Sequence, residues 1–151
     1  MIEFESIAAL SKLVGKEAAV SEWLEISQER INKFAEATND FQWIHVDVER
    51  AKASPLGSTI GHGFLTLSLI AGFSFKTFKV NGVRMGINYG LNKVRFTSQV
   101  PAGSRLRGRF TLKETKPIDG GLQVFWLVTV EREGSDKPAA IAETISLMYA
   151  A

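Results

Sequence analysis

The chain has 151 residues, of which 45% are hydrophobic and 23% are charged, a size and composition typical of one globular domain with its own core. It contains no cysteine, which excludes disulfides, thiolate metal sites and a cysteine nucleophile. The formal net charge is only +2, and the basic residues of the second half alternate with apolar ones rather than gathering in a patch. We therefore expect a single domain over residues 1–151 that does not bind nucleic acid.

The first ten residues, MIEFESIAAL, carry acidic residues where a secretory signal needs basic ones. No segment offers the run of about 18 apolar residues that a membrane-spanning helix requires. We expect a cytoplasmic protein without a membrane partner.

The first third of the chain predicts a strand followed by helices. Residues 19–26 have the mixed pattern of a short strand, and Ser27 can then cap a helix by accepting a hydrogen bond from its first turn. Ile31 and Phe34 recur at helical spacing, and Asn39 is a suitable stop because asparagine tolerates the left-handed conformation that often closes a helix.

Asp47 begins a second short helix, VERAKA, and the proline and glycines of SPLGSTIGHG then predict a loop. The next segment, GFLTLSLIAGFSFKTF, is apolar on nearly every side. Such a pattern predicts a helix that is buried all round.

The second half predicts the sheet around that helix. Apolar and polar residues alternate, or apolar residues dominate, over 93–100, 105–113, 122–131 and 139–149, and turn signals separate these runs. The expected fold class is α+β, with a curved antiparallel sheet wrapped around a buried central helix.

The stretch NDFQWIHVD places Asp40 five residues before His45, one of only two histidines. Taken alone, these residues fit a loop that ends a helix as well as they fit an acid–base pair. The second histidine, His62, stands in the predicted loop before the apolar helix, where hydrogen bonding to nearby backbone is the simplest role. The three residues could in principle hold a metal, but they lack the close spacing of a helical histidine pair, and we predict no metal site.

Three separated motifs resemble the MaoC-like dehydratases and (R)-specific enoyl-CoA hydratases, which have the hot-dog fold. They are FAEATNDFQWIHVDVERAKAS, STIGHGFLTLSL and NKVRFTSQVPAGSRLRGR, and together they extend over most of the chain. The family's first motif has glycine, asparagine and proline where this chain has Asn39, Gln42 and Trp43. The form QWIHVD is most similar to the nodulation-protein-N-like branch of the family.

This resemblance implies a catalytic site and a substrate. Asp40 and His45 would be the acid–base pair, and the backbone N–H of Gly63 would stabilise the thioester oxyanion. The implied substrate-binding residues are Gln42, Trp43, His62 and Phe64.

The implied reaction is the syn addition of water to a 2-enoyl thioester, or its removal from an (R)-3-hydroxyacyl thioester. No cofactor is expected, because coenzyme A or acyl carrier protein would enter as part of this small-molecule acyl thioester. The resemblance also implies a homodimer or a higher homo-oligomer.

Two other functions stay open on sequence grounds. A hot-dog thioesterase usually carries a carboxylate on or near the central helix, and residues 63–75 contain none. A non-catalytic acyl-thioester-binding subunit is the other alternative, because the large ring of Trp43 could narrow the acyl channel.

Overall fold

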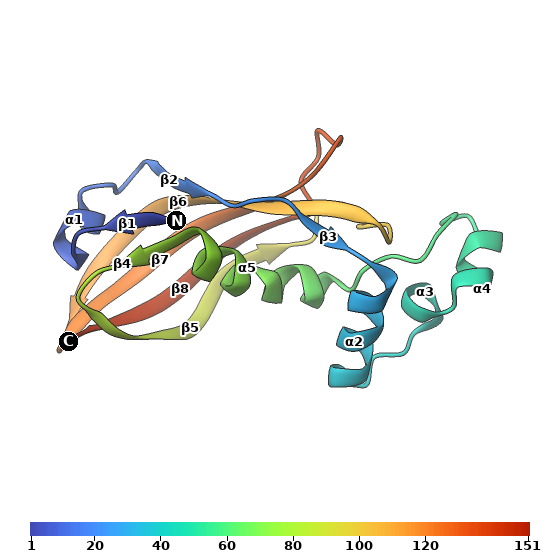
Figure 1. Ribbon diagram of the computed structural model, residues 1–151, viewed down its shortest axis with the longest axis horizontal. Helices are drawn as coiled ribbons and strands as arrows, with labels where there is room; N and C mark the ends of the chain where they lie inside the picture. The colour runs from blue at the N-terminus through green and yellow to red at the C-terminus, as the bar shows by residue number, and fades with distance from the viewer.

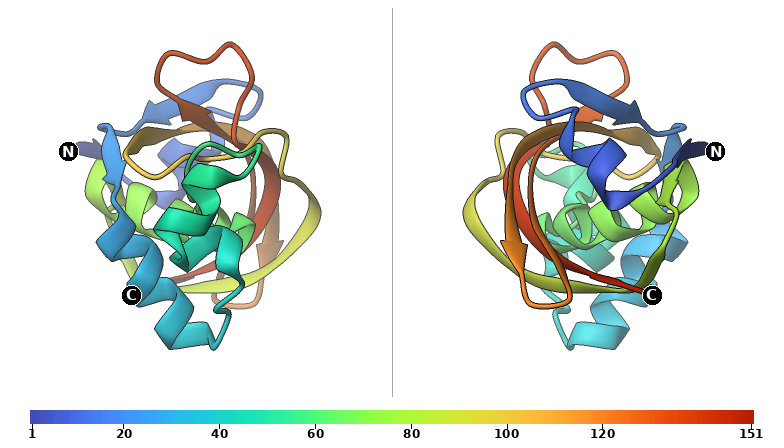
Figure 2. Two further views of the ribbon diagram at one scale, coloured as in Figure 1. Left: turned by 90° about the vertical axis from the view of Figure 1, so that its right-hand side faces the viewer. Right: turned by 90° about the vertical axis from the view of Figure 1, so that its left-hand side faces the viewer.

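The computed structural model describes residues 1–151, and its main feature is a six-stranded antiparallel sheet curled around one long helix, α5 (Figures 1 and 2). The strand order is β2-β6-β7-β8-β5, and β3 also pairs with β6. The sheet strands are β2 (Glu17–Val20), β3 (Leu24–Ile26), β5 (Val83–Arg95), β6 (Ser104–Ile118), β7 (Gly121–Arg132) and β8 (Ala140–Ala150). Strands β1 (Ile2–Phe4) and β4 (Phe78–Val80) form a separate parallel pair, and the helices are α1 (Ile7–Ser11), α2 (Gln28–Thr38), α3 (Trp43–Val46), α4 (Val48–Ala53) and α5 (Gly63–Thr77).

Local capping chemistry sets the limits of α2 and α4. Ser27 Oγ accepts from the N–H of Arg30 at 3.2 Å, as predicted, and Asn39 ends α2 in the left-handed conformation with φ of 59°. Asp47 caps α4 in the same way, because its carboxylate accepts from the N–H of Arg50 at 3.0 Å. These helices lie beyond one end of the sheet, next to the start of α5 (Figure 1).

The core lies between α5 and the inner face of the sheet. Alternate residues of β6 and β7 point inward, so Leu106, Phe110 and Leu112 of β6 are fully buried beside Val124 and Val128 of β7. The predicted fold class is thus confirmed: the chain is α+β, with a hot-dog arrangement of sheet and helix.

The prediction that α5 is buried on every side was wrong for one face. Phe64 and Phe75 have 69% and 77% of their surface exposed, and Ser68 and Ala71 lie between them on the same exposed stripe. The helix is apolar on nearly every side, but the sheet of this chain covers only part of it.

Two strand predictions also needed correction. The strand expected over 93–100 ends at Arg95, and it begins at Val83, in a Gly- and Asn-interrupted segment that carries no clear period of two. The strand expected over 19–26 is two strands, β2 and β3, separated by residues 21–23. Ser21 still pairs with Gly108 of β6, because its N–H donates to the Gly108 carbonyl at 2.9 Å and its hydroxyl accepts from the Gly108 N–H at 2.8 Å.

The outer face of the sheet carries paired charges. Glu131 of β7 accepts from Arg107 at 2.6 Å and also faces Arg109, which in turn donates to Glu17 of β2 at 2.9 Å. Burial opposes ionisation of Glu131, but the hydrogen bonds and positive charges of Arg107 and Arg109 outweigh it and lower the pKa of this carboxyl. The basic residues of β6 are therefore engaged within the sheet surface. None of the helices combines the length and hydropathy that a membrane crossing requires.

Candidate active site

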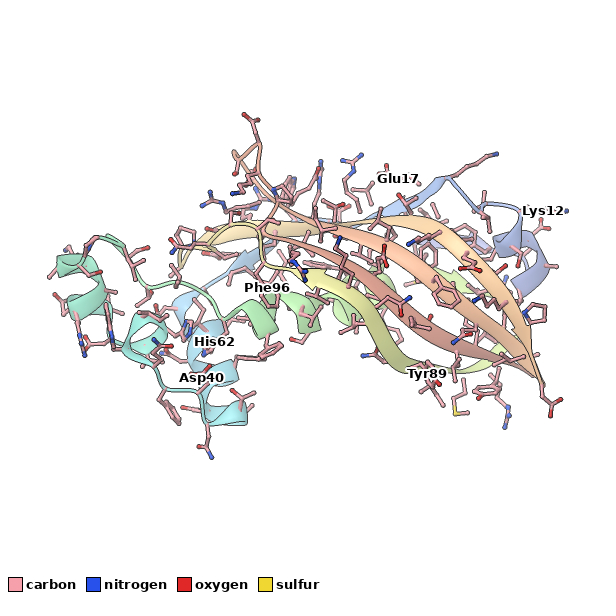
Figure 3. All side chains as sticks on the ribbon, turned by 180° about the vertical axis from the view of Figure 1, so that it is seen from behind. Lys12, Glu17, Asp40, His62, Tyr89 and Phe96 are labelled. Atoms are coloured by element: carbon pink, nitrogen blue, oxygen red, sulfur yellow. The ribbon has the colours of Figure 1, made fainter.

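Asp40, His45 and His62 come together where α2, α3 and the loop into α5 meet, beyond the end of the sheet (Figure 3). A carboxylate oxygen of Asp40 and one ring nitrogen of each histidine all lie within 4.8 Å of one another. Both histidines are buried, whereas the Asp40 side chain is 51% exposed. The two side chains predicted as an acid–base pair therefore face the same small space, and solvent reaches it from the Asp40 side.

The end of α2 positions Asp40. The left-handed turn at Asn39 reverses the chain, and the N–H of Asp40 then donates to the carbonyl of Ala35 at 3.1 Å. One carboxylate oxygen accepts a long hydrogen bond of 3.4 Å from the N–H of Gln42. The carboxylate keeps free lone pairs that can bind water.

His45 lies in the short helix α3, which we did not predict. Hydrogen bonds to its ring and to its backbone carbonyl fix its orientation. Its Nδ1 donates to the carbonyl of Ile60 at 2.7 Å, so in the neutral ring the lone pair is on Nε2. The His45 carbonyl accepts from Gln28 Nε2 at 2.8 Å, and Gln28 Oε1 accepts from the buried hydroxyl of Thr59. The network presents Nε2 of His45 as a proton acceptor in a set orientation.

His62 packs between the pair and the core. Its ring stacks on that of His45 with centroids 3.8 Å apart, and it contacts Phe34 with centroids 4.9 Å apart. Its Nε2 donates to the backbone carbonyl of Asp40 at 3.0 Å, and its buried Nδ1 has no partner. The simple role expected from the sequence is present, but His62 also holds Asp40 and His45 in place relative to each other.

Gly63 is the first residue of α5, so its N–H has no partner within the helix and lies at the positive end of the helix dipole. Glycine, which has no side chain, lets a ligand approach the backbone closely. The structure adds another reason, because a Cβ at position 63 would lie only 2.8 Å from Cδ2 of Phe96. A side chain at position 63 would therefore force the ring of Phe96, which is 46% exposed, to move.

A shared water fits the geometry of this cluster better than a metal ion. Ligands on one tetrahedral zinc ion stand about 3.4 Å apart, given bonds of about 2.1 Å, and catalytic zinc needs three such protein ligands. Here the atoms lie within 4.8 Å of one another, the Asp40 carboxylate is 3.9 Å from His62 Nε2, and that nitrogen already donates to the backbone carbonyl of Asp40. Groups at such separations are readily bridged by one water.

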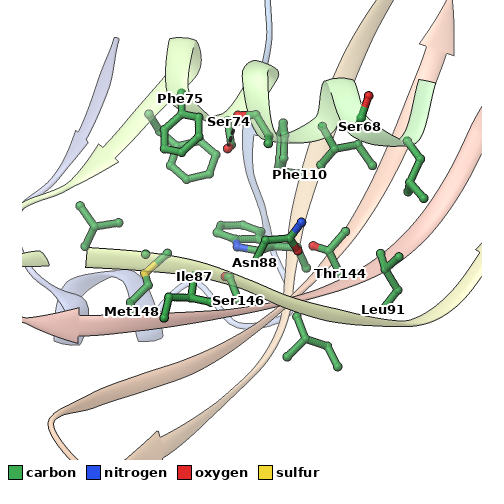
Figure 4. A pocket seen from close by; sticks show the side chains of 18 of the residues that line it. Ser68, Ser74, Phe75, Ile87, Asn88, Leu91, Phe110, Thr144, Ser146 and Met148 are labelled. Atoms are coloured by element: carbon green, nitrogen blue, oxygen red, sulfur yellow. Dashed lines mark hydrogen bonds between the residues drawn. The ribbon is translucent and has the colours of Figure 1, made fainter. Parts of the chain in front are cut away.

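An elongated cavity begins beside this cluster. It has a volume of about 660 Å³ and runs between α5 and the inner faces of β5, β7 and β8 (Figure 4). Phe34 and Phe64 line the end nearest His62 and Gly63, and hydrophobic side chains make up 15 of its 22 lining residues. Such a cavity suits an apolar chain attached to a group held at the Asp40–His45 site.

Residues 10–132 match the family described as the MaoC like domain. The chain belongs to the MaoC-like family. This confirms the resemblance read from the three sequence motifs.

Two curated relatives of this MaoC-like protein are similar over nearly its whole length. The 3-hydroxyacyl-thioester dehydratase Z of Mycobacterium tuberculosis is 49% identical over 146 residues, which are 96% of this chain and 97% of the relative. Nodulation protein N of Rhizobium leguminosarum bv. viciae is 45% identical over 146 residues, 95% of this chain and 91% of the relative. The similarity to the nodulation-protein-N-like branch is thus confirmed.

Among solved structures, the unliganded (R)-hydratase PhaJ1 of Pseudomonas aeruginosa superposes with a TM-score of 0.76. The two share 21% sequence identity over 97% of this chain and 86% of the hydratase. At this identity the match supports the hot-dog fold of the MaoC-like chain.

The four residues predicted to bind substrate lie in different surroundings. Phe64 lines the cavity, and His62 lies beside its end. The side chain of Gln42 is exposed, and the ring of Trp43 packs under the guanidinium of Arg50, 4.2 Å from the ring centroid, without lining the cavity. A channel narrowed by Trp43 therefore finds no support in this arrangement.

Sequence reasoning missed two supporting residues, Gln28 and Phe34. Gln28 is 17 residues before His45, and in the sequence it is an ordinary polar position in the first turn of a helix. Phe34 was recognised only as part of an apolar helix face. Neither role can be predicted without knowing that α2 packs against the loop before α5.

Proposed function

We propose that this MaoC-like protein is an (R)-specific enoyl-thioester hydratase, which in reverse acts as a 3-hydroxyacyl-thioester dehydratase. The observation that carries the proposal is the convergence of Asp40 and His45 on one space beside the start of α5, with His45 Nδ1 engaged and Nε2 left as acceptor. The name of the Mycobacterium tuberculosis relative supports the same reaction class.

In the proposed hydration, Asp40 and His45 hold one water. His45 Nε2 takes a proton from this water as its oxygen attacks Cβ of the enoyl thioester, and the C=C electrons move toward the thioester carbonyl. The proton taken by His45 passes to Asp40, and Asp40 delivers it to Cα. The hydroxyl and the hydrogen add to the same face, and groups of this kind contribute about 10²–10⁴ each to the rate.

The negative charge on the thioester oxygen needs a donor, and the N–H of Gly63 is suited to this role. It is unpaired and lies at a helix N-terminus, where an anion is favoured. A single preorganised donor of this type contributes about 10²–10³ to the rate. This chemistry requires no cofactor, since coenzyme A or acyl carrier protein is part of the substrate.

The thioesterase alternative has less support, because α5 carries no carboxylate from Gly63 to Thr77. The binding-subunit alternative came from the three changed motif positions around Asp40 and from a channel narrowed by Trp43. The narrowing has no support, because Trp43 packs against Arg50 outside the cavity. A cytoplasmic location goes with the hydratase proposal and stays a prediction from the sequence.

We also propose that the protein is a homodimer. β5 is a 13-residue edge strand whose outer edge has no partner, and Met85, Ile87, Tyr89 and Leu91 expose apolar surface along it. Long unprotected edges of this kind favour pairing with a second chain. Residues of the exposed α5 stripe line the same cavity as Ile87 and Leu91 of β5, so one partner can cover both surfaces.

The direct test of function is an assay of the purified protein with crotonyl-CoA. We expect the enoyl absorbance to fall without release of free thiol, and chiral analysis should find (R)-3-hydroxybutyryl-CoA. Release of thiol would favour the thioesterase, whereas binding without turnover would favour the binding subunit. Either result would contradict the hydratase proposal.

A further inference from the structure

The cavity beside α5 has a polar patch on a wall that should be apolar. Its members are Asn88 of β5 together with Thr144 and Ser146 of β8, and all three line the cavity. In the sheet register Asn88 lies opposite Ser146, while Thr144 and Ser146 are two residues apart on one strand and so share a face. Figure 4 shows the side chains of Asn88 and Thr144 directed into the space below α5.

The patch is a departure from the pattern of the surrounding sheet. On the neighbouring strand β7, the inward residues opposite Ser146 and Thr144 are Val124 and Trp126, both buried. Polar residues on the core-facing side of a strand are unfavourable unless they have a partner or a function. Places where sequence breaks a folding rule tend to be functional sites.

None of these three polar side chains has a hydrogen-bond partner within the protein. The Oγ atom of Ser146 is buried and unpartnered. The two serines on the opposite wall differ, because Ser68 donates to the carbonyl of Leu65 at 2.9 Å and Ser74 donates to that of Ala71 at 2.8 Å. Only the Ser146 Oγ atom is buried, and a buried polar group without a partner is unfavourable. Thr144 is half-buried and Asn88 is exposed, so these two side chains border the open space of the cavity without a partner in the protein.

The position of the patch relates it to the acyl chain of a substrate. The cavity starts at Phe64, beside the proposed oxyanion donor, and extends along α5 to Phe78, which at 1.5 Å per helical residue is about 21 Å. Figure 4 places Asn88 between the levels of Ser68 and Ser74 on the helix. A chain whose thioester is bound at Gly63 would thus pass hydrophobic wall first and reach the patch part-way along the cavity.

We propose that Asn88, Thr144 and Ser146 bind a hydroxyl group carried on the acyl chain, so that the preferred substrates are hydroxylated medium-chain acyl thioesters. The inference rests on the proposed hydratase function and makes its substrate class more specific. A hydroxyl both donates and accepts, as the side chains of asparagine, serine and threonine do, so it can satisfy more than one member of the patch.

The test compares pairs of 2-enoyl-CoA thioesters of equal length, with and without a hydroxyl at the far end, in chain lengths from about six to twelve carbons. At one length the wild-type protein should prefer the hydroxylated partner in kcat/KM by about tenfold, since one hydrogen bond changes affinity by about two- to tenfold. Calorimetric binding of the matching 3-hydroxyacyl-CoA pair supplies a second readout that does not depend on turnover.

Variants locate the preference. The near-isosteric changes Asn88→Leu, Thr144→Val and Ser146→Ala, made singly and together, should lower the ratio and finally reverse it in favour of the plain chain. Ser74→Ala is the matched control, because that hydroxyl lines the same cavity but is already bonded to its own helix, and it should leave the ratio as in the wild type.

The outcomes separate the two proposals. A protein that hydrates crotonyl-CoA but prefers the plain chain at every length, or whose preference is unaffected by the patch variants, overturns the inference and leaves the hydratase function standing. A protein that hydrates none of the thioesters overturns the proposed function itself. If circular dichroism shows that the triple variant does not fold, the single variants still measure the change in the preference ratio.

Discussion

At the scale of single residues, the ring of Phe96 decides what position 63 can hold. A Cβ there would be 2.8 Å from Cδ2 and 3.0 Å from Cε2 of Phe96. At Gly72, on the same helix, no atom beyond the adjacent residues and the local helix backbone lies within 4 Å of an added Cβ. Two glycines of one helix therefore differ in their tolerance of a methyl group for a reason that depends on tertiary contacts alone.

Gly63→Ala is expected to destabilise the protein by about 1–3 kcal/mol, the usual cost of forced overpacking. Gly72→Ala should instead stabilise it by about 0.5–1 kcal/mol, because alanine favours the helix and the site is open. Urea unfolding of both variants measures the contrast.

Gly63→Ala should cost less stability in a Phe96→Ala background than in the wild-type protein, because the ring that would clash with the new methyl group is then absent. Equal midpoints for Gly63→Ala and the wild type would show that the ring does not press on this position.

Local chemistry made part of the site predictable at this scale. Ser27 and Asn39 set the two ends of α2, and Asp47 sets the start of α4, through contacts with residues a few positions away. The sequence therefore predicted that Asp40 and His45 lie in the segment that joins these two helices. The stack of His62 on His45 joins residues 17 positions apart in the chain, and nothing in either local sequence signals it. Which residues act in catalysis stays a prediction that kinetics must test.

At the scale of elements, the strongest predictions were those with one clear period. The limits of α5 and the inward residues of β6 followed from pattern alone. β5 was found only in part, because glycines at 86 and 90 and the register shift between Asn88 and Gly90 interrupt its alternation. The exposed stripe of α5 was missed for a different reason. An apolar helix face is the same in sequence whether the same chain or a second copy covers it.

The α5 stripe and the β5 edge together predict the assembly. Tyr89 projects from β5 (Figure 3). Its surface is 62% exposed, and that of Phe75 on the α5 stripe is 77% exposed. Light scattering after gel filtration should give about twice the chain mass of 16.6 kDa for the wild-type protein. Phe75→Asp with Tyr89→Asp should give the mass of one chain, since charges at the centre of an apolar interface oppose association.

Val14→Asp is the control for this experiment, because Val14 is also an exposed apolar residue but lies after α1, away from the proposed interface. It should keep the dimer mass. A wild-type protein that elutes as a monomer at micromolar concentration would contradict the proposed homodimer.

At the scale of the whole molecule, the fold brings two different surroundings together. The helical segment around α2 and α3 supplies a polar cluster reached by solvent, and the curled sheet supplies a long apolar cavity that begins at the same point. The free N–H groups at the start of α5 lie where the two meet. The sequence motifs predicted this family and its hydratase or dehydratase chemistry, in agreement with the names of its relatives. The polar patch within the cavity could not be predicted in this way, because it depends on how β5, β7 and β8 are aligned in the sheet.

The central claim is that Asp40 and His45 act on one and the same water. Its most direct test is kcat/KM for crotonyl-CoA in Asp40→Asn, His45→Gln and the double variant, with folding checked by circular dichroism. Each single change should cost at least about 10², and the double variant should be about as slow as the slower single one, because residues that act as a unit are not additive. Wild-type rates in both single variants, or losses that multiply in the double variant, would contradict the claim.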